Sequence, residues 1–162
     1  MTGIPMPRAR GPMIKDAPDH HDAELVLRLY DLRRETSLRE ARRYLATEFW
    51  PATQADLLAV IKPDHPAHTA FRQVTGYWEM AYGMARHGIV NPDYLVENTG
   101  EGILVFAKFR PWLAEFRTAA GSPRIFRNAE WIATGCEMGR TLAEVFGQRV
   151  EKAIAARKQG NA

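Results

Sequence analysis

The sequence predicts an all-α fold, a compact bundle of about seven to eight helices joined by short loops. Apolar residues recur at the three- and four-residue spacing of amphipathic helices along most of the chain. Proline and glycine divide these segments from one another. Only residues 103–109, a mostly apolar run that contains Lys108, could form a strand, and a single strand would have no partner.

The composition predicts one helical domain between two short tails. The chain has 162 residues, of which 46% are hydrophobic and 25% charged, as is typical of a globular protein. Residues 1–18 predict a flexible basic tail, residues 19–158 a single domain and residues 159–162 a C-terminal tail. No apolar run reaches the ~20 residues of a membrane span. The tail has no apolar stretch of a secretory signal, and with a single cysteine the expected location is the cytoplasm.

Two helices are predicted at the start of the domain. From Asp22, three leucines at i, i+4 and i+7 predict an amphipathic helix. Ser37 is expected to cap a second helix, because Glu40 three residues later completes a capping box. Pro51 ends that helix. The expected inner residues of the two helices are Leu25, Leu29, Leu32, Leu38, Ala41, Leu45 and Phe49.

A short helix and a long aromatic helix follow. Thr53 is a candidate N-cap of the short helix, which Pro63 ends. Pro66 suits the first turn of the long helix, and Gly88 suits a left-handed position at its C-terminus. The expected inner face of the long helix consists of Phe71, Val74, Trp78, Ala81, Tyr82 and Ala85.

Shorter helices and a final long one are predicted in the second half of the chain. Asn91 and Pro92 supply the cap and first turn of a short helix, and a further helix follows it. Pro111 either kinks or divides that further helix. The elements expected beyond it are a loop over 119–123 and helices over about 124–136 and 138–157.

Three segments resemble a family of bacterial all-helical domains of unknown function. They are Tyr77-Trp78-Glu79, the turn at 86–91 (RHGIVN) and residues 106–112 (FAKFRPW). The resemblance covers about residues 20–134. It implies a helical fold, but no activity and no catalytic residue. Many members resemble membrane-tethered proteins with an apolar N-terminal helix, whereas the N-terminus of this chain is polar and basic, so a tether is not implied here.

Positive charge is concentrated at the two ends of the chain. The formal net charge is +3, yet residues 1–15 and residues 149–162 each carry a net charge of +3, so the intervening segment is net negative. A nucleic-acid-binding domain more often carries its basic stripe on the folded surface. An RNA- or ribosome-associated protein that uses its basic termini therefore stays an alternative, not the favoured function.

Two pairs of histidines are candidate metal ligands. His20 and His21 stand between two aspartates, where acidic residues at a helix start are the simpler interpretation. His65 and His68 stand three residues apart, but zinc requires three or four ligands. We therefore expect no metal and no cofactor, although metal binding by either pair stays open.

No catalytic residue is predicted from the sequence. Cys136 lies among apolar residues and is predicted to be a small buried side chain. A glycine-rich phosphate loop is absent from the sequence. The alternative of an enzyme or a small-ligand-binding protein depends on a polar site near the aromatic helix, formed by His65, His68, Glu79 and His87.

The favoured function is a helical interaction module that self-associates or binds a protein partner. Residues 28–43 contain six arginines interleaved with acids, which form either a solvated, salt-bridged face or a surface for an anionic partner. Two aromatic residues are expected outside the main apolar stripes, where they could anchor a partner. The residues predicted for the partner surface are Arg33, Arg34, Arg39, Arg42, Arg43, Tyr77 and Trp112.

Overall fold

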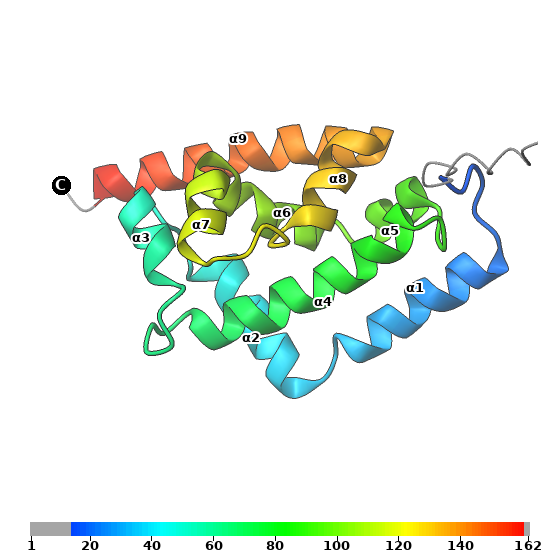
Figure 1. Ribbon diagram of the computed structural model, residues 1–162, viewed down its shortest axis with the longest axis horizontal. Coiled ribbons are helices and arrows are strands. Elements are labelled where there is room, and N and C mark those ends of the chain that lie inside the picture. The colour runs from blue at the N-terminus through cyan, green and yellow to red at the C-terminus, as the bar shows by residue number, and fades with distance from the viewer. Residues whose placement is uncertain (1–13, 161–162) are drawn as a thin grey trace, which may run out of the picture.

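The computed structural model describes residues 14–160, which form nine α-helices and one 3-10 turn without any strand (Figure 1). The all-α prediction is confirmed. In chain order the helices are α1 (His20–Leu32), α2 (Thr36–Thr47), α3 (Gln54–Ala59), α4 (His68–Arg86), α5 (Pro92–Asn98), α6 (Glu101–Phe109), α7 (Leu113–Ala119), α8 (Arg127–Gly135) and α9 (Glu137–Gly160). Residues 1–13 and 161–162 of the predicted tails lie outside the described residues, whereas residues 159–160 are the end of α9 and not part of a tail. No helix within residues 14–160 is long and apolar enough to cross a bilayer.

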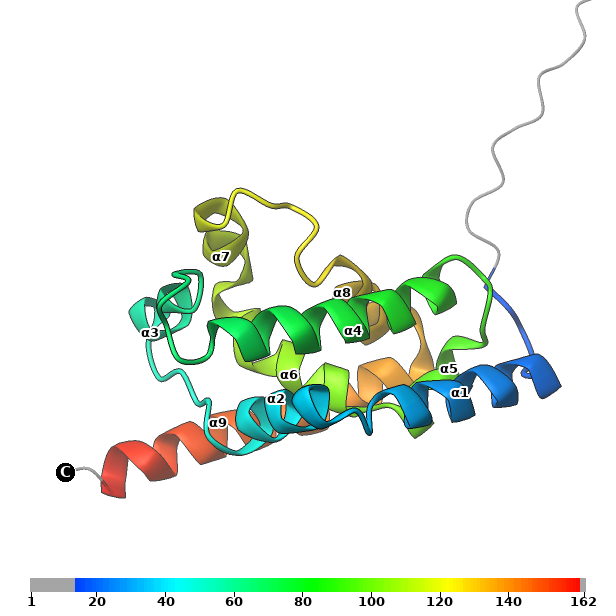
Figure 2. The ribbon, with the colours of Figure 1, turned by 90° about the horizontal axis from the view of Figure 1, so that it is seen from below.

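Helix α6 lies at the centre of the bundle, between α9 and α4 (Figures 1 and 2). Every residue from Gly102 to Phe109 is buried. A helix enclosed by other helices has no solvent-facing side, so residues 102–109 are apolar except for Lys108. This explains why residues 103–109 also have the composition of a buried strand.

A cluster of phenylalanine rings joins four segments of the chain. The ring centroid of Phe109 lies 5.2 Å from Phe71, 5.2 Å from Phe116 and 4.9 Å from Phe126. These rings come from α6, α4, α7 and the residue before α8. The inner face predicted for the long aromatic helix is confirmed, because all six of its residues are buried.

Several predicted helix ends are confirmed by their caps. The Thr53 side chain accepts a hydrogen bond from the amide of Asp56 at 3.1 Å and forms a capping box for α3. Asn91 caps α5 ahead of Pro92. Gly88 follows α4 with a left-handed φ of 72°. Each cap involves residues close together in the chain, so the local sequence is sufficient to predict it.

Three predicted helix starts are wrong. The long helix α4 begins at His68 with Ala67 as its N-cap, so Pro66 precedes the helix and is not in its first turn. The N-cap of α2 is Glu35 instead of Ser37. The Glu35 carboxylate accepts hydrogen bonds from the amides of Leu38 and Ser37, at 2.8 and 3.1 Å, and these bonds lower its pKa. Helix α8 begins at Arg127, because a left-handed φ of 58° at Phe126 interrupts any helix that starts earlier.

The helix predicted to contain Pro111 is divided at this residue. α6 ends at Phe109, residues Arg110–Trp112 form the 3-10 turn, and α7 begins at Leu113. Proline lacks the amide hydrogen that would continue the α-helical ladder, and the chain changes direction at this point.

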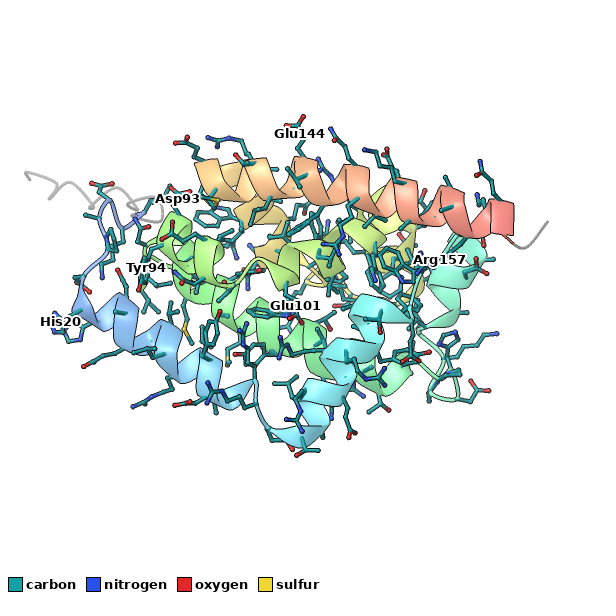
Figure 3. The ribbon with its side chains drawn as sticks, turned by 180° about the vertical axis from the view of Figure 1, so that it is seen from behind. His20, Asp93, Tyr94, Glu101, Glu144 and Arg157 are labelled. Carbon is teal, nitrogen blue, oxygen red and sulfur yellow. The ribbon has the colours of Figure 1, made fainter. Side chains whose placement is uncertain are left out.

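A buried lysine joins α6 to the end of α2. Lys108 is 1% exposed, and its ammonium group donates hydrogen bonds to the carbonyl oxygens of Leu45 and, at 2.9 Å, Phe49. Carbonyl groups at the end of a helix have no partner within it, so the lysine serves as a C-terminal cap. The same Nζ lies 3.7 Å from the ring centroid of Trp50. The guanidinium of Arg157, a residue labelled in Figure 3, lies 4.4 Å from the same centroid. Burial, with nearby arginine charges on α9, lowers the pKa of Lys108 to about 7.

Candidate functional site

A cavity of about 760 Å³ lies along α4, between this helix and the segment 120–128 that connects α7 to α8. Figure 2 shows this segment, in yellow, leading from α7 back to α8 alongside α4. We call the cavity the α4 groove. The residues that line it are His68, Phe71, Arg72, Thr75, Gly76, Glu79, Met80, Arg86 and His87 on one wall, Phe116, Ala120, Ser122, Arg124, Ile125, Phe126, Arg127 and Asn128 on the other, and Ile61 at its edge. Its volume is within the range of protein binding sites.

Three of the four residues of the predicted polar site line this groove. They are His68, Glu79 and His87, whereas His65 lines a smaller hollow beside Phe49. At a rise of 1.5 Å per residue, His68 and His87 are about 28 Å apart along α4. Side chains so far apart cannot act on one bond of a substrate. Their arrangement supports the binding of an elongated molecule better than catalysis.

The two histidines at the start of α4 are held by the backbone around them. The Nδ1 atom of His68 lies 2.9 Å from the carbonyl oxygen of Val60. A carbonyl oxygen only accepts, so the tautomer with the proton on Nδ1 forms this hydrogen bond. The Nδ1 atom of His65 instead accepts from the amide of Ala67 at 3.1 Å. With Nδ1 occupied, His68 has only Nε2 available to the groove.

Glu79 connects the two walls of the groove. Its carboxylate accepts hydrogen bonds from the backbone amides of Asn128 and Ala129, at 3.0 and 2.8 Å, in the first turn of α8. The side-chain amide of Asn128 donates back to the carbonyl oxygen of Glu79 at 2.8 Å. Burial raises the pKa of Glu79, while the two amide donors oppose that rise. The carboxylate is therefore engaged in positioning α8 and is not a free base.

The lining of the groove contains four arginines but only one carboxylate, that of Glu79. Arg72, Arg124 and Arg127 are exposed, and none of them forms an ion pair or a side-chain hydrogen bond with another of the residues 14–160. Arg86 donates to the side-chain oxygen of Asn128 at 3.3 Å. The groove therefore presents an excess of positive charge to whatever occupies it.

The four arginines of the groove are not among the site residues predicted from the sequence. A usable signal exists on α4, where His68, Arg72, Gly76 and Met80 recur every four residues and form a second face next to the aromatic stripe. The opposite wall has no such signal, because segment 120–128 is mostly irregular and its position depends on packing against other parts of the chain.

A strained residue shapes the second wall. Phe126 has φ 58° and ψ 20°, a left-handed conformation that costs a non-glycine residue roughly 1–2 kcal/mol. Its ring is buried in the phenylalanine cluster, which holds the backbone in this conformation. Such strain is concentrated at binding sites and other functional segments. Here it directs the first amides of α8 toward Glu79.

Arg42, predicted for a partner surface, has partners within the chain. Its Nε donates to the Glu101 carboxylate at 2.9 Å, and its terminal nitrogens donate to the same carboxylate and to the carbonyl oxygen of Arg33. Glu101, labelled in Figure 3, begins α6, so the pair connects α2 to α6. Both side chains are largely buried, and Arg42 is structural in this position.

The remaining arginines of this predicted surface lie on a solvated face outside the groove. Arg39 is exposed and has no ion pair with another residue in the range 14–160. The partners of the others are Asp31 for Arg34 at 4.0 Å, Glu48 for Arg43 at 2.5 Å and the ring of Tyr30 for Arg33 at 3.5 Å. Of these four arginines, Arg34 and Arg43 are paired with a carboxylate, so the face is solvated and only partly salt-bridged.

The two predicted aromatic anchors also lie outside the groove. Tyr77 is 9% exposed, and its hydroxyl donates to the carbonyl oxygen of Leu29 at 2.5 Å, which joins α4 to α1. Burial raises the pKa of this tyrosine. Trp112 is half-buried in the 3-10 turn and packs against the main core. Tyr77 is thus a core residue instead of an exposed anchor.

The histidines proposed as metal ligands do not lie in a group of metal-ligating side chains within residues 14–160. His20 and His21 are exposed at the start of α1, where Asp19 acts as the N-cap in a capping box with Asp22. Within residues 14–160, no three His, Cys, Asp or Glu side chains are grouped so that they could hold a metal ion. Cys136 is 5% exposed, as predicted, and burial raises the pKa of its thiol to about 11.

The fold and the groove define an all-helical domain with an elongated basic cavity along α4. The chain belongs to the family described as a domain of unknown function (DUF4760), which matches residues 18–136. The family resemblance over about residues 20–134 is confirmed. No curated protein and no solved structure matches the chain significantly.

Proposed function

We propose that this protein is an interaction module that binds an extended segment of a partner protein in the α4 groove. The observation that supports this function is the length of the groove. Lining residues extend from His68 to His87, about 28 Å along α4. An extended chain advances about 3.3 Å per residue, so a segment of roughly eight residues would fill it.

The lining also has the mixed character of a peptide-binding surface. Met80 is 48% exposed although it is a large apolar residue, and Ile61 and Ile125 are half-buried in the groove. Polar and charged side chains, among them Arg72, Thr75 and Arg124, line the groove together with these apolar residues. Apolar contacts supply the affinity of such a surface, and the polar groups determine which segment binds.

Gly76 provides a specific way to block the groove. A Cβ atom at this position would have nothing within 4 Å, so a larger side chain there projects into open space in the groove. Gly147 on α9 also has nothing within 4 Å and lies outside the groove, so it is a matched control.

The test is a selection from a library of displayed random peptides of about twelve residues, long enough to fill the groove. Selected peptides should bind the wild-type protein and the Gly147→Leu variant equally, as measured by fluorescence anisotropy. Their affinity for Gly76→Leu should be lower by about tenfold or more. Thermal unfolding of both variants establishes that they are folded. Enrichment of no peptide, or equal binding to Gly76→Leu, would overturn the proposal.

A further inference from the structure

We infer that the segment bound in the α4 groove is acidic, with carboxylates that pair with arginines on both walls and an apolar side chain that contacts Met80 and Ile125. This inference rests on the proposed function and specifies the partner's chemistry. It depends on the charge of the groove, on the geometry of the guanidinium group and on the exclusion of one competing occupant.

The charge of the groove is not neutralised within the described part of the chain. Glu79 is the one carboxylate in the lining, and its oxygens accept the amides of Asn128 and Ala129. Arg72 and Arg124 thus face the groove from opposite walls without a carboxylate partner among residues 14–160. By contrast, Arg117 just outside the lining pairs with Glu130 at 2.8 Å.

Arginine is suited to this form of recognition. The guanidinium group presents its donors in a planar fork that matches a carboxylate, and the pair is favourable when partly shielded from water. Arg72 lies near the N-terminal end of α4 and Arg86 at its C-terminal end, so an acidic segment could meet cations along most of the groove. A small anion would contact only one end.

The N-terminal residues of the chain itself are a poor occupant. Residues 1–15 carry Arg8, Arg10 and Lys15 and have no acidic residue, so a cationic groove would repel them. A second copy of the chain is another possible occupant, and a test for a concentration-dependent dimer distinguishes it from a partner segment.

The experiment uses the peptides selected on the wild-type protein, with three comparisons. We expect Asp and Glu to be enriched in these peptides together with at least one Leu, Ile, Phe or Trp. A twin of the best peptide, with Asn and Gln in place of Asp and Glu, should bind about tenfold or more weakly. The affinity of the acidic peptide should fall as the salt concentration rises, because salt screens exposed charges.

Protein variants identify the arginines that act. The double variant Arg72→Gln/Arg124→Gln should lose about tenfold in affinity for the acidic peptide and much less for its amide twin. The control is Arg28→Gln/Arg39→Gln, which removes two exposed arginines outside the groove and should leave the affinity unchanged. Circular dichroism establishes that both double variants are folded.

The outcomes that contradict the inference differ from those that contradict the proposed function. The acidic segment would be rejected if the selected peptides were neutral or basic, or if the amide twin bound with equal affinity. In that case, weaker peptide binding by Gly76→Leu would still support the groove as the binding site. A concentration-dependent dimer that Gly76→Leu abolishes would identify a second copy as the occupant. Displacement of the peptide by inorganic phosphate at a similar concentration would assign the arginines to a small anion.

Discussion

Glu79 and Asn128 bind each other reciprocally across the α4 groove. The carboxylate of Glu79 accepts the backbone amide of Asn128 at 3.0 Å, and the side-chain amide of Asn128 donates to the backbone carbonyl of Glu79 at 2.8 Å. The residues are 49 positions apart in the chain. Their pairing holds the start of α8 against α4 and so joins the two walls of the groove.

Replacement of Glu79 with alanine should loosen this connection. The variant leaves the first amides of α8 without their acceptor, a loss comparable to that of an N-cap residue, so the free energy of unfolding should fall by about 1–2 kcal/mol. Urea denaturation measures the change. Glu115→Ala is the control, because Glu115 is exposed on α7 and forms no ion pair with another of the residues 14–160. Equal stability of the two variants would contradict the role assigned to Glu79.

Alanine at different helical glycines should have opposite effects. Gly76→Ala and Gly147→Ala should each raise the free energy of unfolding by about 0.5–1 kcal/mol, because alanine favours the helix and neither Cβ meets another atom. Gly102→Ala should destabilise the protein, since its Cβ would lie 2.5 Å from the Tyr82 hydroxyl oxygen and 2.8 Å from the Trp78 ring. Thermal or urea unfolding of the three variants tests this. A stabilising Gly102→Ala would show that α6 is not in close contact with α4.

Lys108 should make stability depend on pH. Its folded-state pKa of about 7 is below the ordinary value of 10.5, so between these pH values the unfolded chain binds more protons than the folded one. The contribution of Lys108 to the free energy of unfolding should therefore rise with pH across this window. In urea denaturation, the free energy of unfolding of the wild type should rise relative to that of Lys108→Met from about pH 7 to about pH 9. Lys152→Met, at an exposed position on α9, should show no such change. A constant difference for Lys108→Met would contradict the lowered pKa.

The Cys136 thiol should be unreactive in the folded protein. It is buried, accepts the amide of Gly139 at 3.3 Å, and has a pKa that burial raises to about 11, so little thiolate forms at neutral pH. Iodoacetamide should label it only after denaturant is added, as mass spectrometry would detect. Fast labelling without denaturant would show that the start of α9 opens in the native state.

The sequence was sufficient where the physical cause is local. Thr53 with Asp56, Asn91 with Pro92, and Gly88 each act on residues within one helical turn, so residue type and spacing predict them. At the start of α2, residue type and spacing were not sufficient to identify the N-cap. Glu35 and Ser37 are both able to cap it, and spacing favoured the serine although the glutamate carboxylate reaches two amides.

The candidate site was partly predictable for the same reason. His68, Glu79 and His87 share a groove because they share α4, which the apolar stripe had identified. The second wall could not be predicted. It depends on the left-handed Phe126, on the phenylalanine cluster and on the contacts of Glu79 with α8, and none of these follows from a short segment.

By itself, then, the sequence determined the helices, most of their ends and most of their buried residues, since these depend on backbone preferences and on periodicity along one segment. Leu32, predicted to face inward, is 52% exposed at the end of α1. The tertiary structure decided which polar residues meet. It paired Arg42 with Glu101, placed Lys108 at the end of α2, and left Arg72 and Arg124 facing one groove. Such contacts join residues far apart in the chain, so they exist only once the packing of the core has placed the helices beside one another.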